Sequence, residues 1–135
     1  VLENCQNITD LAFFNLRRMN TLKLKNQITP PGVFFHLKSL RKLEIINCQK
    51  ITNEEFIHLR NLRTLELSKC SKISDFALVY LIKLQTLSIK HSHNITGEGF
   101  VHLRSLSTLC LSSCDGIVDE YIAFWKEAQN FSQNN

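Results

Sequence analysis

The side chains best suited to catalysis or metal binding in this sequence are its five cysteines and five histidines. His91 and His93 lie two positions apart, a spacing that places both imidazoles on one face of a strand, where they would share a metal ion. No further histidine follows this pair at the H-x3-5-H spacing of zinc sites. The stretch ITGEGF lacks the strand–GxGxxG–helix frame of a dinucleotide site. We therefore predict no catalytic residue, no metal site, no cofactor and no enzymatic activity.

Four of the five cysteines share one position in a repeating pattern. Each stands three residues after an apolar residue of strand character, and Gln27 and Ser92 fill the same position in two further units. The cysteines of this column are Cys5, Cys48, Cys70 and Cys114. Cysteine suits a small buried position because its S–H is a weak donor. We predict a structural ladder of free thiols, with Cys110 outside it at an exposed position.

The repeat itself is clearest in the apolar residues. Second leucine-type positions of L-x-L units recur at steps of 22, 21, 22, 22 and 22 residues, at Leu2, Leu24, Ile45, Leu67, Ile89 and Leu111. Six residues later an isoleucine follows in five of the units, and in the short second unit we assign that role to Ile28. A repeat of this length predicts a solenoid, in which each unit buries its apolar face only against its neighbours.

Each unit divides into a strand and a short helix. The L-x-L pieces have the period of a strand, with leucines on one side. Apolar residues three apart, such as Phe56, Leu59 and Leu62, have a roughly helical period. A hydroxyl residue precedes each helix and is expected to cap it, and Thr52 with Glu55 reads as a capping box. The predicted caps are Thr9, Thr29, Thr52, Ser74 and Thr96.

The segment LRTLELSKCSKISDFALVYL resembles a leucine-rich repeat of the cysteine-containing kind found in F-box substrate receptors of ubiquitin ligases. It is also similar to short repeats of bacterial and protozoan proteins. The resemblance covers about Val1 to Trp125. It implies an α/β solenoid with a curved parallel sheet on the concave side and short helices on the convex side. It also implies that the cysteine column points inward, where its side chains meet the backbone of the turn.

The domain organisation follows from where the repeat begins and ends. We expect leucine-rich repeats over residues 1–117, a C-terminal capping helix over residues 118–131 and a tail over residues 132–135. Trp125 and Phe131 of the capping helix fall in apolar columns of the repeat. The chain begins inside a unit, so we expect an open strand edge there, onto which further repeats or a partner would associate.

Composition narrows the class of partner. The formal charge is +4, but glutamates are mixed among the Lys and Arg residues, unlike the concentrated positive charge of nucleic-acid binders. No apolar run reaches the ~18 residues of a membrane span. We predict a protein partner, no nucleic acid and no membrane span. An exposed Cys110 thiol suits a reducing compartment, so we expect the chain to be cytoplasmic.

The outward strand positions form the first candidate contact surface, because solenoids usually bind through their concave face. Lysines gather in the N-terminal half, glutamates in the middle and small hydroxyls toward the C-terminus. The residues predicted to contact a partner are Lys23, Lys25, Lys42, Glu44, Ile46, Glu66, Ser68, Ser88 and Lys90.

A basic column after the predicted helices forms an alternative surface. Its functional interpretation is a ridge for an acidic partner, and its structural interpretation is charge placed at helix C-termini, where the dipole favours cations. The ridge consists of Arg17, Lys38, Arg60 and Arg104, and Ile82 interrupts it.

The function predicted from the sequence is a protein–protein interaction module that binds through the concave face. Three more specific alternatives stay open. A substrate receptor of a ubiquitin ligase requires an F-box before Val1, and a pathogen effector or surface protein requires an export signal there. The third alternative is a scaffold piece of a larger assembly.

Overall fold

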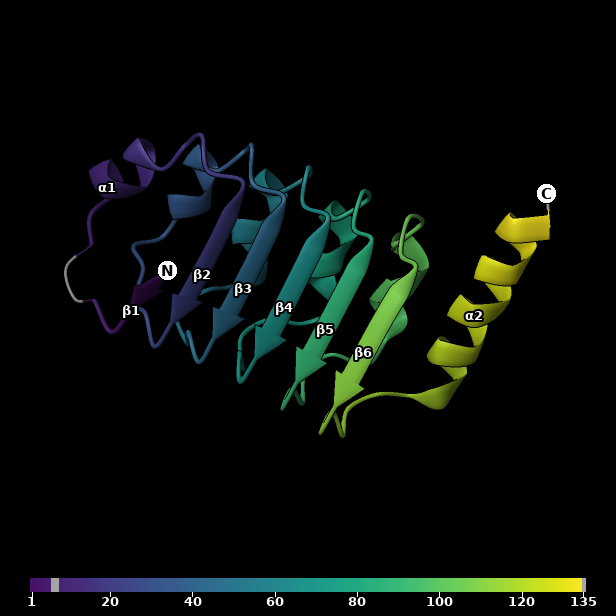
Figure 1. Cartoon of the computed structure of the whole chain (residues 1–135). Coiled ribbons are helices and arrows are strands. Elements are labelled where there is room, and N and C mark those ends of the chain that lie inside the picture. The colour runs from purple at the N-terminus through teal and green to yellow at the C-terminus, as the bar shows by residue number, and fades with distance from the viewer. Residues whose placement is uncertain (6–7, 135) are drawn as a thin grey trace.

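The computed structural model describes residues 1–5 and 8–134, and shows one six-stranded parallel sheet covered by helices on one side (Figure 1). The strands follow the order of the sequence and pair in register, so that Leu43 lies beside Leu65 and Leu65 beside Leu87. They are β1 (Leu2–Glu3), β2 (Thr21–Lys25), β3 (Lys42–Ile46), β4 (Thr64–Ser68), β5 (Thr86–Lys90) and β6 (Thr108–Ser112). The predicted leucine-rich-repeat solenoid is confirmed.

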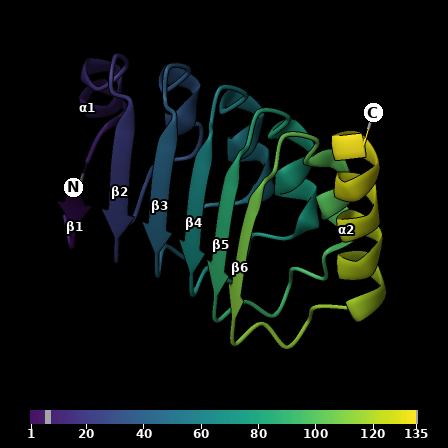
Figure 2. The same cartoon turned by 45° about the vertical axis from the view of Figure 1, so that its right-hand side comes forward.

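The return segments form the second layer, on the side of the sheet away from the outward strand residues (Figure 2). They are α1 (Asp10–Asn15), η1 (Val33–His36), η2 (Asn53–His58), η3 (Asp75–Tyr80), η4 (Glu98–His102) and α2 (Asp119–Asn134). The four η segments are 3₁₀ helices, which explains the three-residue spacing of apolar residues. Leu59 N–H donates to Phe56 O and Leu62 N–H to Leu59 O, both at 3.0 Å.

The core lies between the two layers and runs the length of the stack. Inward strand leucines meet one large apolar residue from each helical segment, and the rings of Phe34 and Phe56 pack edge to face at 6.1 Å. Full burial of one such side chain stabilises the fold by about 1.5–3 kcal/mol. Ile28 does not join this core: it is 61% exposed, and Thr29 is buried instead. The assignment of Ile28 was wrong because the second unit is only one residue shorter than the others, so its inward position falls on Thr29, five residues after Leu24.

A tight turn follows every strand at the same point. The first residue after each strand has a φ between 51° and 56°, in the left-handed region, and none of the six is glycine. Its N–H continues the sheet ladder, as in Asn47 N–H to Ser68 O at 2.8 Å. Asparagine adopts this conformation more readily than most residues. The six residues are Asn4, Asn26, Asn47, Lys69, His91 and Ser113.

The cysteine column lies directly behind these turns and points inward, as predicted. Cys48 and Cys70 are buried, whereas Cys5 and Cys114 are half-buried near the two ends of the stack. The Cys70 thiol lies 3.3 Å from Ser68 O, so the weak S–H donor meets turn backbone. All five cysteines are free thiols in this structure. Burial raises the pKa of the Cys48 and Cys70 thiols above the ordinary value.

Most of the predicted helix caps are wrong in their chemistry, and only Thr96 accepts a backbone N–H at the start of a helix, from Glu98 at 3.2 Å. Thr9, Thr52 and Ser74 stand at the N-cap positions of α1, η2 and η3 but make no side-chain capping bond there. The helices η1 and η4 begin after Gly32 and Gly97 in place of the threonines. The capping box does not form either.

Most of the missing caps come from the neighbouring repeat. Asn53 Oδ1 accepts from Ser74 N–H at 2.8 Å, and its Nδ2 donates to Ser74 Oγ at 2.9 Å. Glu55 Oε1 accepts from Gly32 N–H at 2.8 Å, in the repeat before its own. The hydrogen bonds that start one helix therefore also fasten two repeats together.

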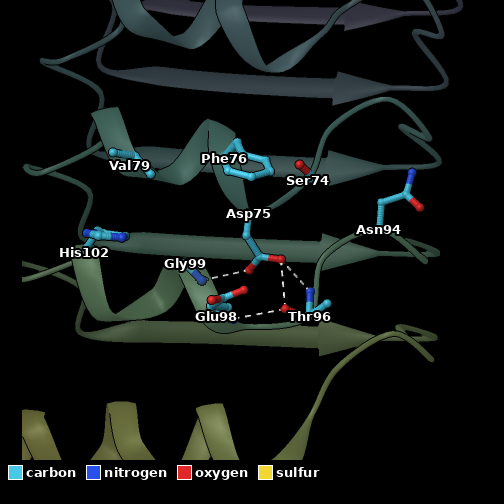
Figure 3. A pocket seen from close by; sticks show the side chains of 9 residues that line it. All are labelled: Ser74, Asp75, Phe76, Val79, Asn94, Thr96, Glu98, Gly99 and His102. Atoms are coloured by element: carbon cyan, nitrogen blue, oxygen red, sulfur yellow. Dashed lines mark hydrogen bonds between the residues drawn. The ribbon is translucent and has the colours of Figure 1, made fainter.

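Asp75 is the most complete of these caps (Figure 3). Its Oδ2 accepts from the N–H and hydroxyl of Thr96 at 2.8 and 3.0 Å, and its Oδ1 from the N–H of Gly97 and Gly99 at 3.0 and 2.9 Å. A Cβ at position 99 would stand 2.8 Å from Asp75 O, so only glycine lets the repeats approach this closely.

The C-terminal helix differs from its predicted limits. It begins at Asp119 and continues through Asn134, so residues 132–134 are helical and not a tail. Ile122 and Trp125 are half-buried against the core. Leu109 and Leu111 of β6 stay half-buried as well, because α2 packs on η4 rather than across the last strand. The predicted core position of Phe131 and the residue Asn135 lie outside what the structure describes.

The thiol ladder predicts an order of chemical reactivity. Cys110 is exposed and should react with iodoacetamide in the folded protein, whereas Cys48 and Cys70 should react only after unfolding, because burial hides them and raises their thiol pKa. Peptide mass mapping after short alkylation at pH 8, with and without denaturant, measures this order. Equal labelling of Cys70 and Cys110 in the folded protein would contradict the inward ladder.

The cap of Asp75 predicts a large loss from a small substitution. Asp75→Ala removes four hydrogen bonds and should lower the free energy of unfolding by about 2 kcal/mol. Glu98→Ala, at an exposed position in the next repeat, is the matched control and should change it by less than about 0.5 kcal/mol. Urea denaturation followed by circular dichroism measures both. Equal effects of the two variants would show that the cap is not structural.

Candidate functional site

The nine predicted contact residues all lie on strands β2–β5, at the positions that alternate with the buried residues facing the helices. This outward face is called the concave face below. Lys42 and Lys90 are exposed, and the other seven are half-buried, because each side chain stands between equivalents from the strands on either side. The structure therefore places the predicted residues on one continuous surface.

The charges on the concave face pair with one another across strands. Lys23 Nζ lies 3.2 Å from Glu44 Oε1, and Lys25 Nζ lies 2.8 Å from Glu3 Oε1. Lys42 Nζ lies 3.9 Å from Glu66 Oε1. Exposed pairs of this kind add about 0–1 kcal/mol each to stability. Their main effect is to neutralise the lysines, so the N-terminal half of this face is not a free positive patch.

One shallow depression of about 120 Å³ interrupts this surface over β3–β5. Ile46 is the one apolar residue among the nine predicted contacts, and it lies in the wall of the depression. Six of the nine residues meet there, and Lys23, Lys25 and Lys42 lie outside it. The six are Glu44, Ile46, Glu66, Ser68, Ser88 and Lys90. Together they offer an apolar contact, two carboxylates, two hydroxyls and one ammonium group.

The alternative basic ridge lies on the helix side of the molecule, and its four cations are exposed. Arg17 stacks over the Phe14 ring, with its guanidinium carbon 4.3 Å from the centroid, and also donates to Phe14 O at 3.2 Å. Lys38 Nζ lies 4.5 Å from the centroid of Phe35. Each of these two cations covers an exposed aromatic ring of its own repeat.

The histidine pair does not form the arrangement considered from its spacing. His91 has the left-handed turn conformation after β5, so the two residues do not share a strand face. His93 instead hydrogen-bonds through Nδ1 to Asp115, and this bond lowers the pKa of the Asp115 carboxyl. Within residues 1–5 and 8–130, no group of three or more His, Cys, Asp or Glu side chains is placed to hold a metal ion.

The sequence analysis missed a row of exposed apolar residues on the helix side. Each follows directly after the buried Phe or Leu of its helical segment, so that buried Phe13 precedes Phe14 and buried Phe56 precedes Ile57. This recurrence is visible in the sequence, but the repeat pattern predicts only the buried Phe or Leu and not the exposed apolar residue after it. The row consists of Phe14, Phe35, Ile57, Val79 and Val101, which are 41–51% exposed.

The apolar character of the helices and the similarity to known proteins both bear on the class of protein. None of the helices in the described part of the chain is long and apolar enough to cross a membrane. No curated protein matches the chain. A family model described as the leucine-rich repeats of the FBD-associated F-box protein At5g56370 matches residues 3–128. With its parallel sheet and one short helix per repeat, the chain belongs to this family of leucine-rich repeats, which are related to F-box proteins.

Proposed function

We propose that the chain recognises a protein partner by holding a segment of it across the concave face over β3–β5. Leucine-rich repeats of this family form a protein-interaction module. The observation that supports binding of a partner segment over β3–β5 is the depression at Ile46, where one apolar side chain is surrounded by hydrogen-bonding and charged groups. Interfaces combine such an apolar contact with a polar rim.

The chemistry of the depression indicates what the partner segment presents. An apolar side chain would pack on Ile46, and a basic group beside it would meet Glu44 and Glu66. Ser68 and Ser88 offer hydroxyls to the backbone of an extended segment. We assign no catalytic role to these residues, since none of them forms a nucleophile–base pair. The exposed Cys110 thiol supports action in the cytoplasm, a reducing compartment.

A charge exchange tests the concave face. Lys42→Glu combined with Glu66→Lys keeps an opposite-charge pair and the net charge but reverses the local field. It should weaken partner binding at least tenfold, as should Ile46→Asp. The partner is first identified by photo-crosslinking from position 46 in cell extract. Its affinity for the unmodified chain and for each variant is then measured.

The matched control exchanges two exposed charges away from this face, Lys72→Glu with Glu127→Lys, and should leave affinity within twofold. Thermal melting of each variant establishes that the fold is retained. A partner whose affinity is unchanged by the Lys42 and Glu66 exchange would place the contact elsewhere and refute the proposal.

A second candidate is more specific: the chain is the substrate-recognition part of an F-box-type ubiquitin ligase. The family match to the repeats of an F-box protein favours it over an effector, a surface protein or a scaffold piece. The transcript that encodes Val1 should then also encode an F-box before it. An export signal in that position would contradict this candidate, without touching the concave-face proposal.

A further inference from the structure

The helix side of the molecule carries three parallel rows of side chains. In a 3₁₀ helix, residues three apart lie on the same side, one after another along the axis. The exposed apolar row defined above occupies the middle of the helical segments. The basic ridge follows it by three residues, as Arg60 follows Ile57, and an N-terminal row precedes it by three, as Glu54 precedes Ile57.

The apolar row has one exposed member in every helical segment from α1 to η4. The His36 ring lies 5.6 Å from Phe14 and 5.4 Å from Phe35, and so bridges the first two members. At the other end, Val101 and Phe124 line one shallow depression of about 340 Å³ between η4 and α2. Single exposed apolar residues are ordinary on a protein surface, but an uninterrupted row over five repeats marks a contact surface.

Charges of opposite sign border this row. Exposed glutamates stand on the N-terminal side at Glu54, Glu98 and Glu120, and Arg60 and Arg104 stand on the other. Helix dipoles favour this polarity, so the charges alone carry no function. Dipoles do not explain the apolar row between them. Within the part of the chain that the structure describes, neither Arg60 nor Arg104 forms an ion pair.

The fourth repeat carries no charge in any of the three rows. Phe76 stands at the position of Glu54 and Glu98 and Ile82 at that of the cations, so with Val79 the three rows are all apolar at η3. These side chains are 76%, 41% and 51% exposed. Beside them lies a depression of about 360 Å³ between η3 and η4, lined in part by Phe76, Val79 and His102 (Figure 3). This repeat therefore presents exposed apolar side chains in all three rows.

We propose that this face binds an amphipathic helix of a partner protein. The apolar side of that helix packs along the row, with Phe76, Val79 and Ile82 as its central contact. Its carboxylates line the edge that meets Arg60 and Arg104, and its basic residues line the edge that meets Glu54 and Glu98. An extended segment fits less well, because the described residues of this layer form helices and turns and offer no strand edge with which it could pair.

Geometry sets the length and direction of the bound helix. Neighbouring strands of a sheet lie about 4.8 Å apart, so four steps from α1 to η4 span at least about 19 Å. A helix of about 13 residues covers that distance at 1.5 Å per residue. Unlike charges on the two edges fix its direction, because reversing the helix would exchange its edges and oppose like charges.

The test is selection of peptides against the full chain. A display library holds 18-residue helical peptides with leucine on one face and random residues along both edges. Enriched peptides should carry Asp or Glu along one edge. Fluorescence anisotropy with the most enriched peptide, synthesised and labelled, then gives its affinity. Phe76→Glu and Ile82→Glu should each weaken binding at least tenfold, whereas Ile28→Glu, at an exposed apolar position outside the row, should change it less than twofold.

Charge controls complete the experiment. Arg60→Glu with Arg104→Glu should weaken binding at least tenfold, and Lys50→Glu with Lys72→Glu, of equal charge change, should not. Four results would overturn the proposal: no peptide tighter than about 100 µM, no acidic edge among the selected peptides, loss of binding only in the concave-face exchange, or a dimer of the chain that Phe76→Glu dissociates. The last would assign the face to a second copy.

Discussion

A single repeat of this chain needs its neighbours to bury its apolar residues, and the rest of the structure depends on that constraint. The side-chain hydrogen bonds follow the same rule: most of those in the described part join residues 20–26 positions apart, in adjacent repeats. Thus Asp75 caps the turn before η4, and Asn53 caps that before η3. Stability in such a stack is set by contacts between neighbours, and a defect in one repeat weakens the two interfaces beside it.

The parts of the fold that depend on period were predictable, and those that depend on a neighbour were not. Leucines at strand spacing specify strands, and their 22-residue recurrence specifies parallel pairing in register. A threonine before a helix gives no sign that the cap will come from another repeat. Thr52 and Glu55 therefore match a capping box in the sequence, whereas in the structure Glu55 accepts from Gly32 N–H. The assignment of Ile28 to the core was wrong for a similar reason, since the different length of its unit does not show which residue turns inward.

The candidate sites divide in the same way. Concave positions follow from the alternation of a strand, so all nine predicted residues lie on one face. Their pairing follows from register: Lys23 lies opposite Glu44 on the adjacent strand, where the two charges neutralise each other. The helix side was predicted only as a basic ridge. Its apolar row went unnoticed because an apolar residue beside a buried phenylalanine is naturally assigned to the core.

The two faces differ in how many of their charged and apolar side chains already contact a complementary group within the chain. In-register strands bring unlike charges into contact, and the concave face gains selectivity from a small apolar depression within a neutralised surface. On the helix side, Glu54 and Glu98 stand in one row, the exposed apolar residues in the next and the cations in a third, with Phe76 and Ile82 extending the apolar surface at η3. A ligand of complementary pattern gains contacts there that the chain cannot make with itself. Such a ligand contacts several repeats at once, whereas each interface within the chain depends only on the two repeats that form it. Its binding would therefore stabilise the whole stack.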